Sequence, residues 1–375
     1  MNYDFSEKEF SFFIELHEML AEFANNHPMV DTGQSVYANI RDAVGRLART
    51  PYLRFAIENP AGFSGMSTLM GAMETVAAVS PSLFLTVEYS TRLFGRALAT
   101  WADEGQKQKW LNPILDGERL GALALCEETV SVDSTSMATT GEKQGESIVV
   151  SGRKQFVVNA SLAPVIGVVG LFDGKPAIFL VEKDCPGLVV EDPEAAFGYP
   201  GAAISTLRLD NCKISEENVI VPGGNEDLPN VLRFWENQVI LGASLGLMKS
   251  AFETARDHAK SHRNGGKPII AYQEIGFKLA EMMTYYQSAQ LLAFRTAWTA
   301  DNDAKSAGEL TLCAKVYCTE SAETVAAEAM KILGSRSYFG ANNAERAYRC
   351  AKFGQVFGTS TELSRVKLGD AALEK

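Results

Sequence analysis

Short β-branched runs separated by turn residues fill the middle of this chain, and long segments with helical periodicity lie on both sides of them. Between about residues 121 and 224, runs such as Val165–Phe172 are bounded by Gly, Pro, Asn and Asp. This pattern is typical of an antiparallel sheet or a small barrel. No long helix interrupts the runs, so a layout of alternating strands and helices is disfavoured.

The flanking segments carry apolar residues at spacings of three and four, which predicts helices. Ser6 and Glu9 have the spacing of a capping box in front of the first apolar run. After the strands, the same periodicity predicts helices over residues 239–258, 271–297 and 307–333, lengths that suit a helix bundle. We therefore predict an N-terminal helical domain (1–120), a middle β domain (121–226) and a C-terminal helical bundle (227–375).

Composition narrows the class of protein. Of the 375 residues, 46% are apolar and 22% are charged, which are ordinary globular values. The net charge of -11 argues against nucleic-acid binding. No apolar run reaches the roughly 18 residues that a membrane helix needs, and the acidic start does not resemble a signal peptide. Six scattered cysteines without a CxxC pair predict free thiols rather than a metal site, so we expect a cytoplasmic protein without membrane insertion.

Six motifs occur in the order and spacing of the acyl-CoA dehydrogenase family, which the whole chain resembles. They are EGQKQKWLNPILDGE at 104–118, LALCEE at 123–128 followed by Asp133, VSGRKQFVVN at 150–159, LDNCKISEENVI at 209–220, KILGS at 331–335 and YRCAK at 348–352. The resemblance implies N-terminal helices, a middle antiparallel β-barrel and a C-terminal four-helix bundle.

The resemblance also implies a reaction. FAD would lie between the domains and be reached partly by a neighbouring subunit of a homotetramer, a homodimer or a heteromer. A base would remove the α-proton of an acyl-CoA thioester while the β-hydrogen leaves as hydride to the flavin. The electrons would then pass to an electron-transfer flavoprotein.

The base is not where most members of the family carry it. In the late motif that reads Y-E-G-T in the family, this chain has VFGTS at 356–360, so Phe357, or Gly358 if one residue is gapped, replaces the glutamate. The segment WENQVILGASLGLM at 235–248 instead resembles the first bundle helix of the isovaleryl-type and long-chain members, which carry the base there. The register implies Glu236 as the base, since the chemistry needs a desolvated carboxylate.

Two other interpretations of the acidic residues stay open. Glu236 could be a solvated glutamate in the first turn of a helix, where the helix dipole favours it. Glu88, on the N-terminal helix that lines the acyl pocket in this family, is the next candidate for the base.

The resemblance places the flavin ring at Leu125, Cys126, Phe156 and Val158. The family's threonines at the Cys126 and Val158 positions are absent, and its tryptophan has become Phe156. Backbone N–H groups would still bind the ring edges, and Phe156 would still pack against the ring. The alternative is that these are apolar residues of the barrel core.

For the diphosphate end, the matching stretch is SHRNGGK at 261–267. His262 stands at the family's arginine position, with Arg263 beside it as the better fork for phosphate. The further residues that the resemblance assigns to FAD are Gln273, Lys331, Gly334, Thr359 and Thr361.

The CoA contacts are less similar, because Phe234 and Asn237 replace a family Asp and Arg. The thioester carrier is therefore CoA or an acyl carrier protein. Besides an active dehydrogenase, the substitutions leave open a catalytically degenerate subunit of a heteromeric dehydrogenase, and a related flavin oxidase or monooxygenase.

Overall fold

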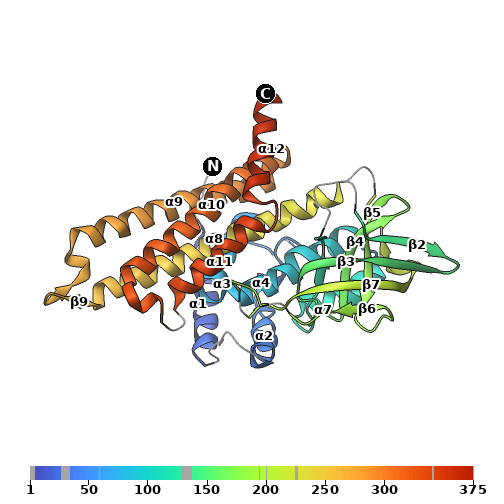
Figure 1. The fold of residues 1–375 in the computed structure, drawn as a ribbon, viewed down its shortest axis with the longest axis horizontal. Helices are drawn as coiled ribbons and strands as arrows, with labels where there is room; N and C mark the ends of the chain where they lie inside the picture. Colours follow the sequence, from blue (N-terminus) through green and yellow to red (C-terminus); the bar gives the residue numbers. More distant parts are fainter. Residues whose placement is uncertain are drawn as a thin grey trace.

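The computed structural model describes residues 5–26, 34–58, 60–128, 137–193, 195–199, 201–223, 227–339 and 342–374. Asp133, part of one family-like motif, lies outside these residues. The chain passes from short helices through a strand-rich part to long C-terminal helices. Figure 1 shows the strands at one end of the molecule and the C-terminal helices extending to the other.

The N-terminal part is helical, as predicted. Its elements are α1 (Glu7–Asn26), α2 (Gln34–Leu47), η1 (Pro51–Arg54), α3 (Gly65–Val79), α4 (Pro81–Glu88), η2 (Tyr89–Gly95), α5 (Arg96–Trp101), α6 (Glu104–Gln106), η3 (Lys107–Leu111) and α7 (Asn112–Leu115). The predicted capping box is confirmed, since the Ser6 amide donates to Glu9 Oε2 over 2.8 Å and the Glu9 amide donates to Ser6 Oγ over 3.3 Å. Glu9 also accepts a hydrogen bond from the Ser64 amide, which ties α1 to the loop before α3.

One helical path of this part leads to the site. It begins at Pro81, where Ser80 Oγ accepts a hydrogen bond from the Leu83 amide, and it continues through α4, η2 and α5. The segment η2 is a wide π-type turn. Such turns are frequent at functional sites, and Tyr89, the first residue of η2, contacts α8.

The middle part is one sheet with strands in the order β6-β7-β3-β2-β4-β5-β8 and with β1 beside β4. The strands are β1 (Ala122–Ala124), β2 (Thr140–Gln144), β3 (Ser147–Val158), β4 (Val165–Phe172), β5 (Lys175–Glu182), β6 (Leu188–Val190), β7 (Ile204–Ser215) and β8 (Val219–Ile220), with the short helix η4 (Glu216–Asn218) before β8. The predicted middle β domain is confirmed, and most of its strand pairs are antiparallel, but the sheet is mixed because β1 and β2 both pair with β4 in parallel. Strand β2 lies between β3 and β4. It is antiparallel to β3 and parallel to β4.

The C-terminal part is the predicted four-helix bundle. Its elements are α8 (Leu228–Ser261), β9 (Arg263–Asn264), β10 (Lys267–Pro268), η5 (Ile269–Ala271), α9 (Gln273–Asn302), α10 (Ala304–Leu333), η6 (Gly334–Ser337), α11 (Asn343–Val356) and α12 (Thr361–Glu374). Helices α8, α9, α10 and α11 pack on one another, whereas α12 contacts α10 and projects from the bundle (Figure 1). The predicted domain boundaries, which stay an interpretation, lie just before β1 and just before α8.

Helix α8 begins earlier than predicted. Asp227 accepts a hydrogen bond from the Asn230 amide, and Pro229 occupies the first turn, so the helix starts at Leu228 instead of 239. Glu236 therefore lies more than two turns inside the helix and is buried. The interpretation of Glu236 as a solvated first-turn glutamate is wrong.

All six cysteines are free thiols. Cys212, Cys318 and Cys350 are buried, as expected, whereas Cys313 is exposed and Cys126 and Cys185 are half-buried. Among the described residues, no helix combines the length and apolar character that crossing a bilayer requires.

Candidate active site

Two side chains hold the buried carboxylate of Glu236. The Tyr89 hydroxyl donates to Glu236 Oε1 over 2.7 Å, and Arg233 Nη1 donates to Oε2 over 2.5 Å. Burial, together with the negative charge of Glu236, raises the pKa of Tyr89 well above its usual value. Tyr89 therefore remains a neutral donor, and the carboxylate is fixed at both oxygens without contact with bulk water.

Arg233 connects this carboxylate to the predicted flavin motif. It lies one turn before Glu236 on α8, and its Nη2 donates to the sulfur of Cys126 over 3.3 Å. Burial alone would lower the pKa of Arg233, but the charge of Glu236 raises it overall. One guanidinium thus spans the distance between Glu236 and Cys126, which places the two predicted site residues side by side.

Aromatic rings form the next part of the site. Phe357, at the family's usual base position, stacks on Phe353 with ring centroids 3.8 Å apart. Its edge meets Phe156 at 5.6 Å, and Phe353 in turn contacts Tyr89 and Tyr199. An aromatic side chain therefore fills the position of the missing glutamate. Through Phe353, it links Phe156 of the flavin motif to Tyr89, which is bonded to Glu236.

The turn after α11 is clamped to α8 and α10. Asn237 Oδ1 accepts a hydrogen bond from the Thr359 amide over 3.0 Å, and Asn237 Nδ2 donates to Thr359 Oγ1 over 3.1 Å. Lys315 Nζ donates to the carbonyls of Phe357 and Thr359. Gly358, with φ +65° and Asn237 Oδ1 only 2.5 Å from where a Cβ would sit, has no room for a side chain. Thr359 is thereby fixed next to the residue that follows Glu236.

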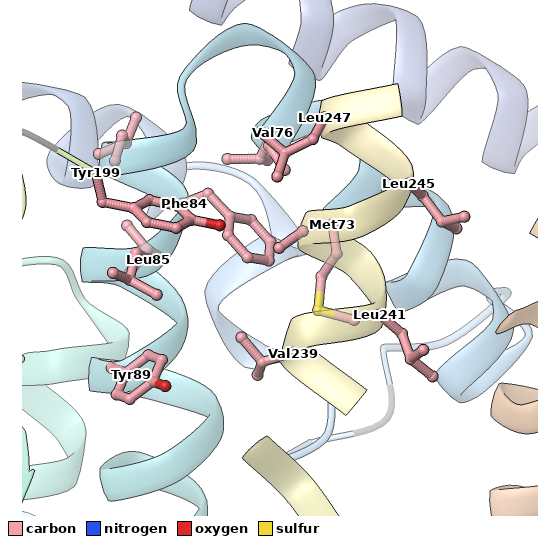
Figure 2. Close-up of a cluster of buried hydrophobic side chains, with 14 of the residues drawn as sticks. Met73, Val76, Phe84, Leu85, Tyr89, Tyr199, Val239, Leu241, Leu245 and Leu247 are labelled. Carbon is pink, nitrogen blue, oxygen red and sulfur yellow. The ribbon is translucent and has the colours of Figure 1, made fainter. Parts of the chain in front are cut away.

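A small apolar cavity lies next to this group. Its volume is about 10 Å³, and Phe84, Leu85, Tyr199, Val239 and Phe353 are among its walls. Figure 2 shows Phe84, Leu85 and Tyr89 on the same helical segment, beside Tyr199 and facing Val239 of α8. A cavity of this size holds at most one water molecule, so an acyl group must displace side chains to enter.

Glu88 has other neighbours. It is fully buried, and its Oε2 lies 3.5 Å from Nε of Arg92, one turn further along the helix. Burial raises the pKa of Glu88, although Arg92 and Tyr52 oppose the shift. Among the described contacts none joins Glu88 to Glu236, Cys126 or Phe156, so the structure gives no support for Glu88 as the base.

The residues of the β domain that were predicted to bind the flavin ring differ in how exposed their side chains are. Phe156 sits at an irregularity of the β3–β7 ladder with φ +57°, and 45% of its side chain is exposed next to Phe357. Val158 is almost completely buried in the core, and Leu125 is buried with its carbonyl bound to Lys154. The side chain of Val158 therefore belongs to the core and is not exposed to a ligand.

A buried ion pair fixes the strand end that carries Cys126. Lys154 Nζ donates to Glu127 Oε1 over 2.6 Å, and Glu127 also accepts hydrogen bonds from the Thr139 amide and hydroxyl. Burial lowers the pKa of Lys154, whereas Lys154 is the main group that lowers the pKa of Glu127 against the effect of its own burial. Cys126 is thus held between this pair and Arg233.

The residues predicted to bind the diphosphate of FAD near β9 lie at the opposite end of the molecule from the sheet. In Figure 1, β9, which carries Arg263, lies far from the sheet that carries Phe156. His262 stacks on His258, Arg263 donates to the Gly266 carbonyl, and Lys331 pairs with Glu328. Gln273 and Gly334, like Arg263 and Lys331, are exposed. One chain therefore does not bring this group to Cys126.

The ring-side residues fit a flavin by the chemistry they offer. An exposed aromatic ring at Phe156, the thiol of Cys126 and the guanidinium of Arg233 supply a flat apolar contact and hydrogen-bonding groups. Hydroxyl donors are missing at positions 126 and 158, so ring edges would be bound by backbone N–H groups. Thr359 and Thr361 are buried beside the same turn.

Comparisons with known proteins identify the family. Models of the N-terminal, middle and C-terminal domains of acyl-CoA dehydrogenases match residues 14–118, 122–212 and 235–373. The chain is 31% identical over 260 residues to cyclohex-1-ene-1-carbonyl-CoA dehydrogenase of Geobacter metallireducens, covering 68% of each chain. It is 27% identical over 301 residues to the mitochondrial short-chain specific acyl-CoA dehydrogenase of Mus musculus, covering 79% of this chain and 73% of the relative.

A solved structure shows the same fold. Butyryl-CoA dehydrogenase from Megasphaera elsdenii superposes with a TM-score of 0.88 at 22% identity over the full length of both chains. The chain belongs to the acyl-CoA dehydrogenase family. It is an oxidoreductase of this FAD-dependent class, and FAD is its cofactor.

Two site residues were missed by the sequence analysis. Arg233 carries a local signal, because a cation three residues before an acid on one helix faces it. Tyr89 carries none, since 147 residues separate it from Glu236. Only the packing of η2 against α8 brings the two together.

Proposed function

We propose that this chain catalyses flavin-dependent α,β-dehydrogenation of an acyl-CoA thioester, with Glu236 as the base. The observation that carries the proposal is the contact chain from Glu236 through Arg233 to Cys126. It places a buried carboxylate next to the motif that resembles the family's flavin-ring segment, whereas the family's usual base position holds Phe357. We find no comparable contact for Glu88.

The chemistry explains why these residues suit the task. The α-proton of a thioester is weakly acidic, so the base must be an ionised carboxylate in a site without water. Arg233 and Tyr89 each donate a hydrogen bond to one carboxylate oxygen of Glu236 and so orient the carboxylate. FAD, when bound, supplies the hydride acceptor. Glu236 takes the α-proton, and the aromatic rings around Phe357 exclude water from the reacting carbons.

An acyl group that reached the apolar cavity between α4, α8 and α11 would have to displace the side chains around it, among them the ring of Phe353 that stacks on Phe357. We propose CoA as the carrier and an acyl carrier protein as the alternative, because Phe234 and Asn237 differ from the family pattern. Asn237 is occupied by Thr359 and does not serve the carrier.

We further propose an electron-transfer flavoprotein as acceptor, on the family resemblance alone, and an assembly of at least two chains. The assembly is supported by the separation of the two groups of predicted FAD residues. Residues near β9 would complete the site of a neighbouring chain, whether in a homodimer, a homotetramer or a heteromer.

The test is an anaerobic titration of the FAD-loaded protein with short-chain acyl-CoAs, followed by flavin absorbance. We expect Glu236→Gln to lower the rate of flavin bleaching by about 10²–10⁴-fold, the usual contribution of a general base, while FAD stays bound. Glu74→Gln is the matched control. Glu74 is also a buried carboxylate bonded to a tyrosine, Tyr286, but it lies on α3 outside the site.

The proposal fails if Glu236→Gln bleaches at the wild-type rate, or if Glu88→Gln loses bleaching while Glu236→Gln keeps it. Wild-type protein that binds FAD and is bleached by no acyl-CoA or acyl carrier protein thioester would also contradict it.

A second function is favoured by two observations. Neither Cys126 nor Val158 offers a hydroxyl to the ring, and Arg263, Gln273 and Lys331, which were predicted for the diphosphate end, are exposed. A heteromeric dehydrogenase in which this chain supplies Glu236 and a different chain completes the FAD site would account for both. Purified chain that takes up FAD only after a second chain is added would support this arrangement, and uptake of one FAD per chain by the pure protein would exclude it.

A further inference from the structure

Arg233 is the buried cation shared by the carboxylate of Glu236 and the flavin motif. Its two terminal nitrogens are bound to Glu236 and to Cys126, and its Nε has no hydrogen-bond partner among the described residues. The other nearby cation, Lys154, is neutralised by Glu127 at 2.6 Å. Arg233 is therefore the buried cation whose balancing charge lies on Glu236, the proposed base.

The neutral groups around Arg233 add no charge of their own. Burial raises the pKa of Cys126, and burial with the charge of Glu236 raises that of Tyr89, so both stay protonated at neutral pH. The groups that face Arg233 from α8, η2, β3 and the end of β1 are thus one anion, Glu236, two neutral groups, Tyr89 and Cys126, and the Lys154–Glu127 ion pair.

If the proposed function holds, the charges at the site move during the reaction, and Arg233 faces a second negative group, the reduced flavin. Before the reaction, the negative charge of Glu236 balances Arg233. The C–H bond at the α-carbon then breaks, its proton goes to Glu236, and the carboxyl becomes neutral. The β-hydrogen would leave with its electron pair, and an oxidised flavin held by the motif that contains Cys126 would gain one negative charge.

We propose that Arg233 is a positioning residue that is paired with Glu236 before the reaction and balances the charge of the reduced flavin after it. The buried site then contains one positive and one negative charge at both stages, so no uncompensated charge is created in a medium where such charges are costly. The guanidinium suits this role because its fork reaches two partners at once, whereas a lysine would act as a point charge.

The test measures the reduction potential of the bound FAD by anaerobic dye titration without any substrate. Arg233→Met should lower the equilibrium constant for two-electron reduction at least tenfold, which is about 30 mV for a two-electron couple. Glu236→Gln should change it in the opposite direction, because it removes the competing anion. Arg233→Lys, which keeps the charge, should stay within about threefold of wild type.

Arg153→Met is the matched control. Arg153 lies on the same strand as Phe156, but it is exposed and paired with Glu128, so water screens its charge. Its removal should leave the potential within about twofold.

Equal potentials in Arg233→Met and Arg153→Met, or a shift of Glu236→Gln in the same direction as Arg233→Met, would overturn the inference. If Arg233→Met does not retain FAD, the Glu236→Gln shift and the Arg233→Lys value decide it. The measurement needs no turnover, so a failure of the charge balance is distinguishable from a failure of the proposed dehydrogenation.

Discussion

Two buried glutamate–arginine pairs, each formed within one turn of helical chain, differ in what the arginine does. Arg92, beside Glu88, donates to the backbone carbonyls of Leu53 and Tyr52, and its contact with the carboxylate is 3.5 Å. Arg233 donates directly to Glu236 over 2.5 Å. Glu88 is the more deeply buried acid, yet only Glu236 is linked to the flavin motif. Burial of a carboxylate therefore does not by itself identify a base.

The two pairs also differ in their tyrosines. Tyr89 follows Glu88 directly in the chain, but its hydroxyl is bonded to Glu236 on another helix. Successive residues of a helix point about 100° apart, so Glu88 faces the N-terminal core and Tyr89 faces α8. One helical segment thus supplies a structural pair on one side and a site residue on the other.

The largest expected difference between the two pairs is in stability, and Arg92→Met tests it. It leaves the Glu88 carboxyl buried without its cation and removes two hydrogen bonds to backbone carbonyls, so we expect a loss of about 3–5 kcal/mol in the free energy of unfolding. Urea unfolding measures this loss. Arg54→Met, which removes a half-exposed arginine with two surface partners, should cost less than about 1 kcal/mol. A similar loss in both variants would show that the Glu88–Arg92 pair is not a stabilising element.

A smaller effect is expected for Tyr89→Phe. Losing a hydrogen bond to a charged group is worth about 1.5–3 kcal/mol, so the rate of flavin reduction should fall by roughly 10–150-fold with little change in the substrate dependence. Stopped-flow absorbance measures the rate. The matched variant is Tyr52→Phe, beside the other pair, which should keep the rate within about threefold. Equal rates in the two variants would remove Tyr89 from the site.

The smallest effect is a pH dependence at Glu88. Burial raises its pKa in the folded protein, so the folded state binds this proton more tightly than the unfolded state. Its contribution to stability is fully present below the unfolded pKa of about 4.5 and is lost as pH rises through the folded value. Compared with Glu88→Gln, the wild type should lose stability as pH increases from about 4.5, with a slope of at most about 1.4 kcal/mol per pH unit. Parallel pH profiles of unfolding for the two proteins would contradict the raised pKa.

Much of the fold could be predicted from local signals. Apolar spacing gave the helices and the bundle, and the β-branched runs between turn residues gave most strands. The capping box of Ser6 and Glu9 was correct because both partners lie within one turn. The parallel pairing of β1 and β2 with β4 was missed, since pairing partners far apart in sequence leave no mark in the periodicity of either strand. The start of α8 was placed too late, at residue 239, although Leu228, Leu232 and Trp235 already follow helical spacing.

The features of the site also fall into those that the sequence determined and those that only the tertiary structure decided. Sequence by itself determined the family, the loss of a glutamate at Phe357 and the acid at position 236, because motif order and register are properties of the chain. It also contained the Arg233–Glu236 spacing, which one helical turn converts into an ion pair. Only the tertiary structure decided that Glu236 is buried, that Tyr89 holds it across helices, and that Glu88 faces elsewhere. Those facts depend on which side of each helix is covered by another element, and that is fixed only when the whole core packs.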